Sequence, residues 1–338
     1  MPTQDNAVIA NRSRDLVAPE LRDSLEALPQ FELNDAVLAQ LRAGGFRDER
    51  LQPPPLSPAQ QAIRCEQCFV PGAPGAPAVR VLVYTPPAAA AIPRPAYLHI
   101  HGGGYVLGMP EQSDGANRSI ASELDCVVVS VAYRLAPETR YPGAVEDCYA
   151  ALHWLHAQAD RLGVDRRRIA IGGDSAGAGH AAALALLVRT RGEIPVCLQL
   201  LDSPMLDDRT GSARDPHPYC GEFVWTAHNN RFGWRALLGV EPGTAAVPAA
   251  AVPARATDLS GLPPTFIVVG ALDLFLEESL EYSRRLIRAG VPTELHVIPG
   301  AYHGFGVAGT AAPQVQECLR LRNAALARAF GSRPESAA

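Results

Sequence analysis

Ile169-Ala-Ile-Gly-Gly-Asp-Ser-Ala-Gly177 is the most informative stretch of this 338-residue chain. An apolar run leads into Gly173-Asp174-Ser175-Ala176-Gly177, and an Ala- and Leu-rich segment begins at once. Strand, tight turn and helix are the context in which the G-x-S-x-G pattern carries meaning. Such a turn strains the serine backbone and lifts its hydroxyl above the edge of a sheet. Ser175 is therefore the candidate nucleophile.

Short apolar runs alternate with helix-like segments on both sides of this turn. Strands are expected at 79–84, 96–100, 126–132, 169–171, 198–201, 265–269 and 294–298, and helices at 144–161, 176–189 and 277–289. Strands that alternate with helices favour a mostly parallel sheet covered on both faces. Ligand-binding and catalytic groups of such sheets lie at the carboxyl ends of the strands. The sequence therefore predicts an α/β protein with its site at that edge.

Two regions interrupt the alternation. Apolar residues recur at helical spacing in the first fifty residues, and prolines follow at 53–55. Residues 207–256 contain two tryptophans and an Ala/Pro-rich stretch but no strand pattern, which indicates an insertion. We expect helices in 1–52 and the insertion 207–256 to form a cap. The catalytic core would then consist of 53–206 and 257–338.

Composition excludes several classes of function. The chain has 30 basic and 35 acidic residues without a basic cluster, so nucleic acid is not an expected partner. It has no lysine, which excludes Schiff-base and P-loop lysine chemistry. Cys65 and Cys68 form a lone C-x-x-C, for which we expect a structural role. With no apolar run of membrane length and no signal-peptide pattern, we expect a cytoplasmic protein without metal or cofactor.

A second motif, His101-Gly-Gly-Gly104, follows the strand expected at 96–100. Glycines let backbone N–H groups approach a substrate oxygen closely, because no Cβ intervenes. The amides of Gly103 and Gly104, with that of Ala176, would form an oxyanion hole for acyl transfer. A flexible turn or a phosphate loop are the alternatives. Phosphate loops usually add a lysine or G-x-G-x-x-G spacing, and neither occurs here.

His303 is the candidate base among nine histidines. It alone falls in a loop after the last expected strand, and it completes the order Ser…Asp…His of this type of site. Asp273 follows the strand at 265–269 and is the candidate acid that orients His303. Asp202, which also ends a strand, is its main competitor.

These motifs together resemble the hormone-sensitive-lipase-like (bacterial family IV) carboxylesterases, and the elbow is most similar to their GDSAG branch. The matching stretches run in order along about 80–310 and are His101–Gly104, Tyr133–Glu138, Gly173–Gly177, Pro204–Arg209, Gly270–Asp273 and His303–Phe305. The resemblance implies an α/β-hydrolase fold with a mostly parallel eight-stranded sheet and a helical cap. It also implies hydrolysis of short- to medium-chain acyl esters, no cofactor, and a homodimer. Arg134 and Glu138 would lie in buried or half-buried pairs.

The chain departs from the family after the acid, where it reads Asp273-Leu-Phe-Leu-Glu277 instead of Asp-Pro-Leu-Arg-Asp. Two other functions remain open. A Ser–His–Asp triad cleaves esters and amides by one mechanism, so an amidase or arylacetamide deacetylase-like hydrolase fits the same residues. A non-catalytic small-molecule binding protein could use the same fold. Because the expected cap is rich in polar residues, we expect activity to fall beyond acyl chains of about eight carbons.

Overall fold

The computed structural model describes residues 13–44, 54–88, 90, 92–212, 217–309 and 311–331. Its centre is an eight-stranded sheet in the order β1-β2-β4-β3-β5-β6-β7-β8. The strands are β1 (Arg64–Val70), β2 (Val79–Thr85), β3 (Arg94–Ile100), β4 (Val127–Ala132), β5 (Val164–Asp174), β6 (Leu198–Asp202), β7 (Thr265–Gly270) and β8 (Thr293–Ile298). Only the pairs β1–β2 and β2–β4 are antiparallel. The predicted mostly parallel α/β sheet is confirmed.

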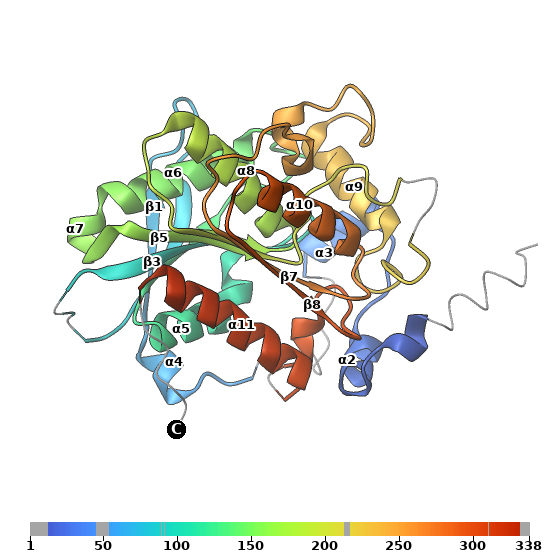
Figure 1. Ribbon diagram of the computed structural model, residues 1–338, viewed down its shortest axis with the longest axis horizontal. Helices are drawn as coiled ribbons and strands as arrows, with labels where there is room; N and C mark the ends of the chain where they lie inside the picture. Colours follow the sequence, from blue (N-terminus) through green and yellow to red (C-terminus); the bar gives the residue numbers. More distant parts are fainter. Residues whose placement is uncertain are drawn as a thin grey trace, which may run out of the picture.

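Helices cover both faces of the sheet (Figure 1). One face carries α6 (Gly143–Ala157), α7 (Ala159–Leu162), α8 (Ala176–Arg191) and α10 (Leu276–Arg288), and the other carries α4 (Pro58–Ala62), α5 (Asp114–Glu123) and α11 (Pro313–Ala329). An apolar cluster lies between the sheet and the helices on each face. Successive strand residues belong to these two clusters in turn: Ile169 and Ile171 of β5 face α6 and α8, whereas Ala170 faces α5 and α11. This alternation places the side chains of every second residue at the ends of β5 and β6 on the α11 side.

Several boundaries differ from the expected ones. Strand β1 was not expected, because an edge strand with an exposed outer face lacks a continuous apolar run. Strand β5 begins at Val164, five residues earlier than expected, since the arginines at 166–168 hide its start from an apolar count. The expected helix at 144–161 divides into α6 and α7 at Gln158. Helix α11 was not among the expected helices either.

A third apolar cluster lies above the carboxyl edge of the sheet, and Trp225 and Trp234 are its largest side chains. It joins α3 (Asp35–Arg42) to the elements α9 (Ala227–Leu238), η4 (Ala249–Ala251) and η5 (Pro253–Arg255). Asn229 of α9 fastens the two parts, because its side chain donates to Phe31 O at 3.0 Å and accepts from Leu33 N at 2.8 Å. The preceding elements η1 (Pro19–Leu21) and α2 (Arg22–Ala27) pack instead, through Leu21 and Leu25, against the apolar cluster on the α11 side of the sheet.

The domain boundaries expected from sequence extend beyond what the structure describes. Residues 1–12 and 45–52 of the expected N-terminal cap, 213–216 of the expected insertion, and 53, 89, 91, 310 and 332–338 of the expected core lie outside the described residues. Between 217 and 256 the structure contains helices and turns without a strand. No helix within the described ranges has the length and apolarity needed to cross a bilayer.

Candidate active site

Ser175 occupies the turn between β5 and α8 in a strained conformation. Its φ is +55° and its ψ is −118°, values that a non-glycine residue adopts only when its surroundings enforce them. The two flanking glycines are required by space: a Cβ on Gly173 would lie 2.2 Å from the Ile100 carbonyl oxygen, and one on Gly177 would lie 2.1 Å from the same atom. The turn therefore packs tightly against β3 and presents the serine hydroxyl at the carboxyl edge.

His303 and Asp273 meet Ser175 in one hydrogen-bonded line. Ser175 Oγ lies 3.0 Å from His303 Nε2, and His303 Nδ1 donates to Asp273 Oδ2 at 2.8 Å. The other carboxylate oxygen of Asp273 accepts from Phe275 N at 2.9 Å, and the Asp273 side chain is fully buried. The ring of Phe275 packs edge-on against the imidazole, with centroids 5.1 Å apart. The structure thus brings together the three residues named from sequence.

Asp202, the competing acid, lies elsewhere at the same edge. It ends β6 beside Asp174 of β5, and within the described residues it makes no hydrogen bond to His303. Burial, followed by the nearby charge of Asp174, raises the pKa of Asp202 to about 7. Of the two candidates, only Asp273 is placed to orient the imidazole.

The glycine-rich loop needs its glycines for two reasons. Gly103 and Gly104 have φ values of +121° and +58°, which favour glycine. A Cβ on Gly103 would also lie 2.1 Å from the Leu107 carbonyl oxygen, and one on Gly104 would lie 2.0 Å from Trp225 Cη2. The loop is therefore fixed by its own turn below and by the tryptophan above.

Three backbone amides near Ser175 are left without a protein acceptor. Among the described residues, the N–H groups of Gly103, Gly104 and Ala176 donate to no other group of the chain. The loop lies against the elbow, because a Cβ on Gly102 would be only 3.4 Å from that of Ser175. Free amides at a helix start beside a serine are what a developing oxyanion requires.

Two other histidines near this edge are structural. His101 stacks on Tyr133 at 4.3 Å between centroids and donates to Gly102 O at 2.8 Å. Burial lowers the pKa of His101 to about 4 and that of His180 to about 3, so both rings are neutral at neutral pH. Neither ring is part of the line from Ser175 through His303 to Asp273.

The Tyr133–Glu138 stretch supports the loop from behind. Arg134 forms a bidentate ion pair with Asp147, whose side chain is fully buried. The expectation for Arg134 is met, but that for Glu138 is wrong. The side chain of Glu138 is 66% exposed and pairs with Arg42 at the surface. Glu138 lies beyond the buried turn, where α3 reaches across it.

Three residues of this region were not identified from sequence. Trp225 covers Gly104, and its ring centroid lies 6.4 Å from that of His303. Val224, next to it, has a φ of +63°, which is rare for a β-branched residue. Tyr302 is fully buried, and its hydroxyl lies 2.8 Å from Ser24 Oγ of α2. For Trp225, the presence of a tryptophan in the expected insertion was a signal in the sequence. The strained backbone of Val224 has no sequence pattern that could have predicted it.

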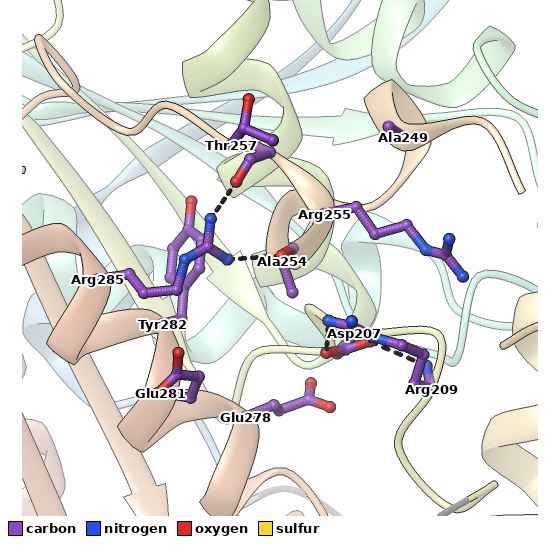
Figure 2. A pocket seen from close by; sticks show the side chains of 11 residues that line it. Asp207, Arg209, Ala249, Ala254, Arg255, Thr257, Glu278, Glu281, Tyr282 and Arg285 are labelled. Carbon is purple, nitrogen blue, oxygen red and sulfur yellow. Dashed lines mark hydrogen bonds and ion pairs between the residues drawn. The ribbon is translucent and has the colours of Figure 1, made fainter. Parts of the chain in front are cut away.

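A pocket of about 460 Å³ lies away from the triad, between α10 and the segment 249–257 (Figure 2). Its charged groups are already used within the protein. Arg209 pairs with Asp207, and Arg285 donates to the carbonyl oxygens of Ala254 and Ala256. None of its lining residues belongs to the Ser175 site.

The twisted sheet, the strained serine and the Ser–His–Asp line define the class of protein: a hydrolase-type α/β fold with a nucleophile elbow. A family model described as "alpha/beta hydrolase fold" matches residues 97–307. The chain belongs to this family, in its hormone-sensitive-lipase-like group.

Named relatives and solved structures agree with this family. Esterase LipI of Mycobacterium tuberculosis is 32% identical over 91% of this chain and 93% of its own length. Carboxylesterase NlhH of the same species is 36% identical over 82% of this chain and 86% of its own length. The solved structure titled "Bacterial Heroin Esterase" has a TM-score of 0.83 and 36% identity, and covers 94% of this chain and 99% of its own.

Proposed function

We propose that the protein is a serine carboxylesterase that hydrolyses short- to medium-chain acyl esters. The observation that carries the proposal is the continuous line from Ser175 Oγ through the His303 imidazole to Asp273, beside three free amides. The names of the relatives, esterase and carboxylesterase, support ester bonds as the substrate.

In the proposed mechanism, His303 Nε2 takes the proton of Ser175 as the serine oxygen attacks the ester carbonyl carbon. Asp273 accepts from Nδ1, which fixes the tautomer with a free lone pair on Nε2 and stabilises the imidazolium that forms. The imidazolium then protonates the departing alcohol, leaving an acyl group on Ser175. Water, activated by the same imidazole, releases the acid and restores the serine.

The oxyanion of each tetrahedral intermediate would be held by the amides of Gly103, Gly104 and Ala176. One such donor typically contributes about 3–4 kcal/mol to the transition state. These amides require no reorganisation, because Trp225 and the tight turn of the loop already fix their direction.

The test is hydrolysis of p-nitrophenyl esters from acetate to palmitate by the wild type and Ser175→Ala, with Ser260→Ala at an exposed position as matched control. We expect turnover to be greatest at short chains, to fall beyond about eight carbons, and to be lost only in Ser175→Ala. Rising turnover from octanoate to palmitate would contradict the substrate range. Faster cleavage of anilides than of phenyl esters would favour an amidase, and a folded wild type that no fluorophosphonate labels would favour a binding protein.

We further propose a homodimer formed through β8. This strand is last in the sheet order, so its outer edge has no neighbouring strand in the described part of the chain. Val297 of β8 and Ile287 of the neighbouring α10 are large apolar residues that are 39% and 60% exposed. Sedimentation velocity should give twice the chain mass of 35.9 kDa, and a monomer at micromolar concentration would reject the proposal.

A further inference from the structure

A second group of polar side chains lies beside the nucleophile, on the α11 side of the sheet. Asp174 precedes Ser175, and Asp202 is its direct neighbour on β6. Both point toward α11, as the alternation along β5 and β6 requires. Helix α11 packs against this side of the sheet, and Cys318 and Arg322 lie one turn apart on its buried face. Cys318 Sγ lies 3.8 Å from Asp202 Oδ2.

The Asp174 carboxylate is reached by solvent although it lies deep at the end of β5. Its side chain is 43% accessible, and its Oδ2 lies 3.1 Å from Nε2 of the buried His99. Burial alone would raise the pKa of Asp174, but the hydrogen bond with His99 and the charges of His99 and Arg322 lower it. Asp174 is therefore an ionised acceptor, partly open to solvent, one residue before Ser175 in the chain.

Two buried donors face these carboxylates without a satisfying partner. Arg322 is 8% exposed, and its positive charge lowers the pKa of both Asp174 and Asp202. Within the described residues it nevertheless forms no ion pair with either carboxylate. Its one hydrogen bond is a long contact of 3.5 Å from Nε to Asn323. A buried guanidinium normally pairs with a carboxylate or binds a ligand.

The second donor is the hydroxyl of Tyr97, which is 1% exposed and has no hydrogen-bond partner among the described residues. A Cβ on Gly172 would lie 2.7 Å from this hydroxyl, so the tyrosine ring crosses β5 one layer below Asp174. Burial, followed by the charge of Asp174, raises the pKa of Tyr97 and keeps it a neutral donor. Unlike the hydroxyls of Tyr84 and Tyr282, the Tyr97 hydroxyl is not fully enclosed by protein, so water or another small polar group can contact it.

We infer that Asp174, Asp202, Arg322 and Tyr97 form a polar subsite that binds a hydroxyl group of the substrate. The inference rests on the proposed esterase function and adds the substrate class: short esters whose acyl or alcohol part carries a hydroxyl. A hydroxyl donates to a carboxylate and accepts from Arg322 or Tyr97 at once, which satisfies both kinds of group. An ammonium has no lone pair to offer Arg322 or Tyr97. A carboxylate would be repelled by the two aspartates, and an alkyl chain would only remove their water.

Two matched pairs of esters test the subsite, each differing by one hydroxyl in place of a methyl group. On the alcohol side the pair is 2-hydroxyethyl acetate and propyl acetate; on the acyl side it is methyl 3-hydroxypropanoate and methyl butyrate. The ratio of kcat/KM within each pair is measured by pH-stat. We expect a ratio of at least about fivefold in favour of the hydroxyl in one pair. The pair that shows it identifies the part of the substrate that enters.

Variants of the subsite residues test whether the kcat/KM ratio within a pair depends on the subsite. Tyr97→Phe and Arg322→Met should each lower it about five- to tenfold. Tyr84→Phe, which removes another buried hydroxyl on β2, should leave it unchanged. Tyr97→Phe should fold, because the lost hydroxyl bonds to no protein group.

Three results would overturn the inference. One is a ratio below one in both pairs of the wild type, and another is a ratio that neither Tyr97→Phe nor Arg322→Met alters. The third is a greater preference for acetylcholine over its neutral analogue 3,3-dimethylbutyl acetate than for either hydroxyl ester over its partner. Each leaves the esterase proposal intact. If the protein hydrolysed none of these esters and no p-nitrophenyl acetate, the proposed esterase function itself would be rejected.

Discussion

Replacing Asp273 by asparagine should disable the site by reversing one hydrogen bond. Oδ1 of Asp273 accepts from the Phe275 amide at 2.9 Å, and Oδ2 accepts from His303 Nδ1 at 2.8 Å. An asparagine must keep its carbonyl oxygen toward the Phe275 N–H, since the opposite orientation would place two donors face to face. Its NH₂ group then points at Nδ1 of His303 and donates to it.

The size of the fall in kcat follows from the histidine tautomer that the asparagine imposes. With Nδ1 as an acceptor, the proton of the neutral ring lies on Nε2, which faces Ser175 Oγ at 3.0 Å and can no longer accept its proton. The equivalent exchange in a serine protease lowers kcat by about 10⁴, or roughly 5.5 kcal/mol. Flipping the amide back would restore the active tautomer but leave both the Phe275 N–H and the asparagine NH₂ without an acceptor, at about 1–3 kcal/mol each. We therefore expect a loss in kcat of between about 30-fold and 10⁴-fold.

The assay is kcat for p-nitrophenyl acetate at pH 8, with thermal unfolding measured alongside. Asp273→Asn should melt within a few degrees of the wild type, because the replacement preserves shape. Asp202→Asn is the matched comparison, since it makes the same exchange on the other acid at this edge; it should cost less than tenfold in kcat. A fall of less than tenfold in Asp273→Asn, or equal falls in both variants, would refute the assignment of the acid and the reasoning from Phe275.

Three further changes have defined outcomes. Gly104→Ala places a Cβ 2.0 Å from Trp225 at a positive φ, which displaces the amide and should lower kcat by about 10²–10³; unchanged turnover would remove Gly104 from the oxyanion hole. Asp147→Ala leaves Arg134, whose side chain is 32% exposed, without its partner and should lower the free energy of unfolding by about 1.5–3 kcal/mol in urea titrations, whereas a loss under 0.5 kcal/mol would mean that the pair contributes no stability. Asp202 has a pKa of about 7 when folded against about 4 when unfolded, so the fold takes up a proton and loses stability as pH rises from about 4 to 7. Asp202→Asn should melt higher than the wild type at pH 8 and show the smaller change between pH 5 and 8; parallel melting curves would contradict this.

The sequence was most informative where one short segment determines its own geometry. The elbow at Ser175 requires small residues at fixed positions, and the backbone contacts of Gly173 and Gly177 with Ile100 explain why. His303 could be chosen because parallel strands deliver their following loops to one edge, which is a consequence of the fold class alone.

Features made by distant segments could not be predicted in the same way. Trp225 covers Gly104, although the two residues are 121 positions apart in the chain and no local pattern couples them. The bond between Tyr302 and Ser24 joins the catalytic loop to an N-terminal helix. Strand β1 was not predicted because many of its residues face solvent, so its sequence contains no apolar run. It forms a strand through its pairing with β2, which local composition does not reveal.

Strained residues explain why these long-range contacts matter to the site. Besides Ser175, four non-glycine residues in the described part of the chain have positive φ. Three of them, Tyr105, Ser203 and Val224, adjoin Gly104, Asp202 and Trp225, and the fourth is Asp125. Such conformations cost of order 1–3 kcal/mol each and persist only where several contacts enforce them.

Those contacts are visible in the backbone around the elbow. The carbonyl oxygen of Ser175 accepts from Met205 N at 3.1 Å, and the Met205 carbonyl oxygen in turn accepts from the Tyr105 hydroxyl at 2.9 Å. Ser203 N donates to Val268 O at 2.7 Å. The glycine loop, the segment after β6 and the nucleophile thus hold one another in place. Because Trp225 closes the same arrangement from above, the segment that carries it supports the geometry of the proposed catalytic site.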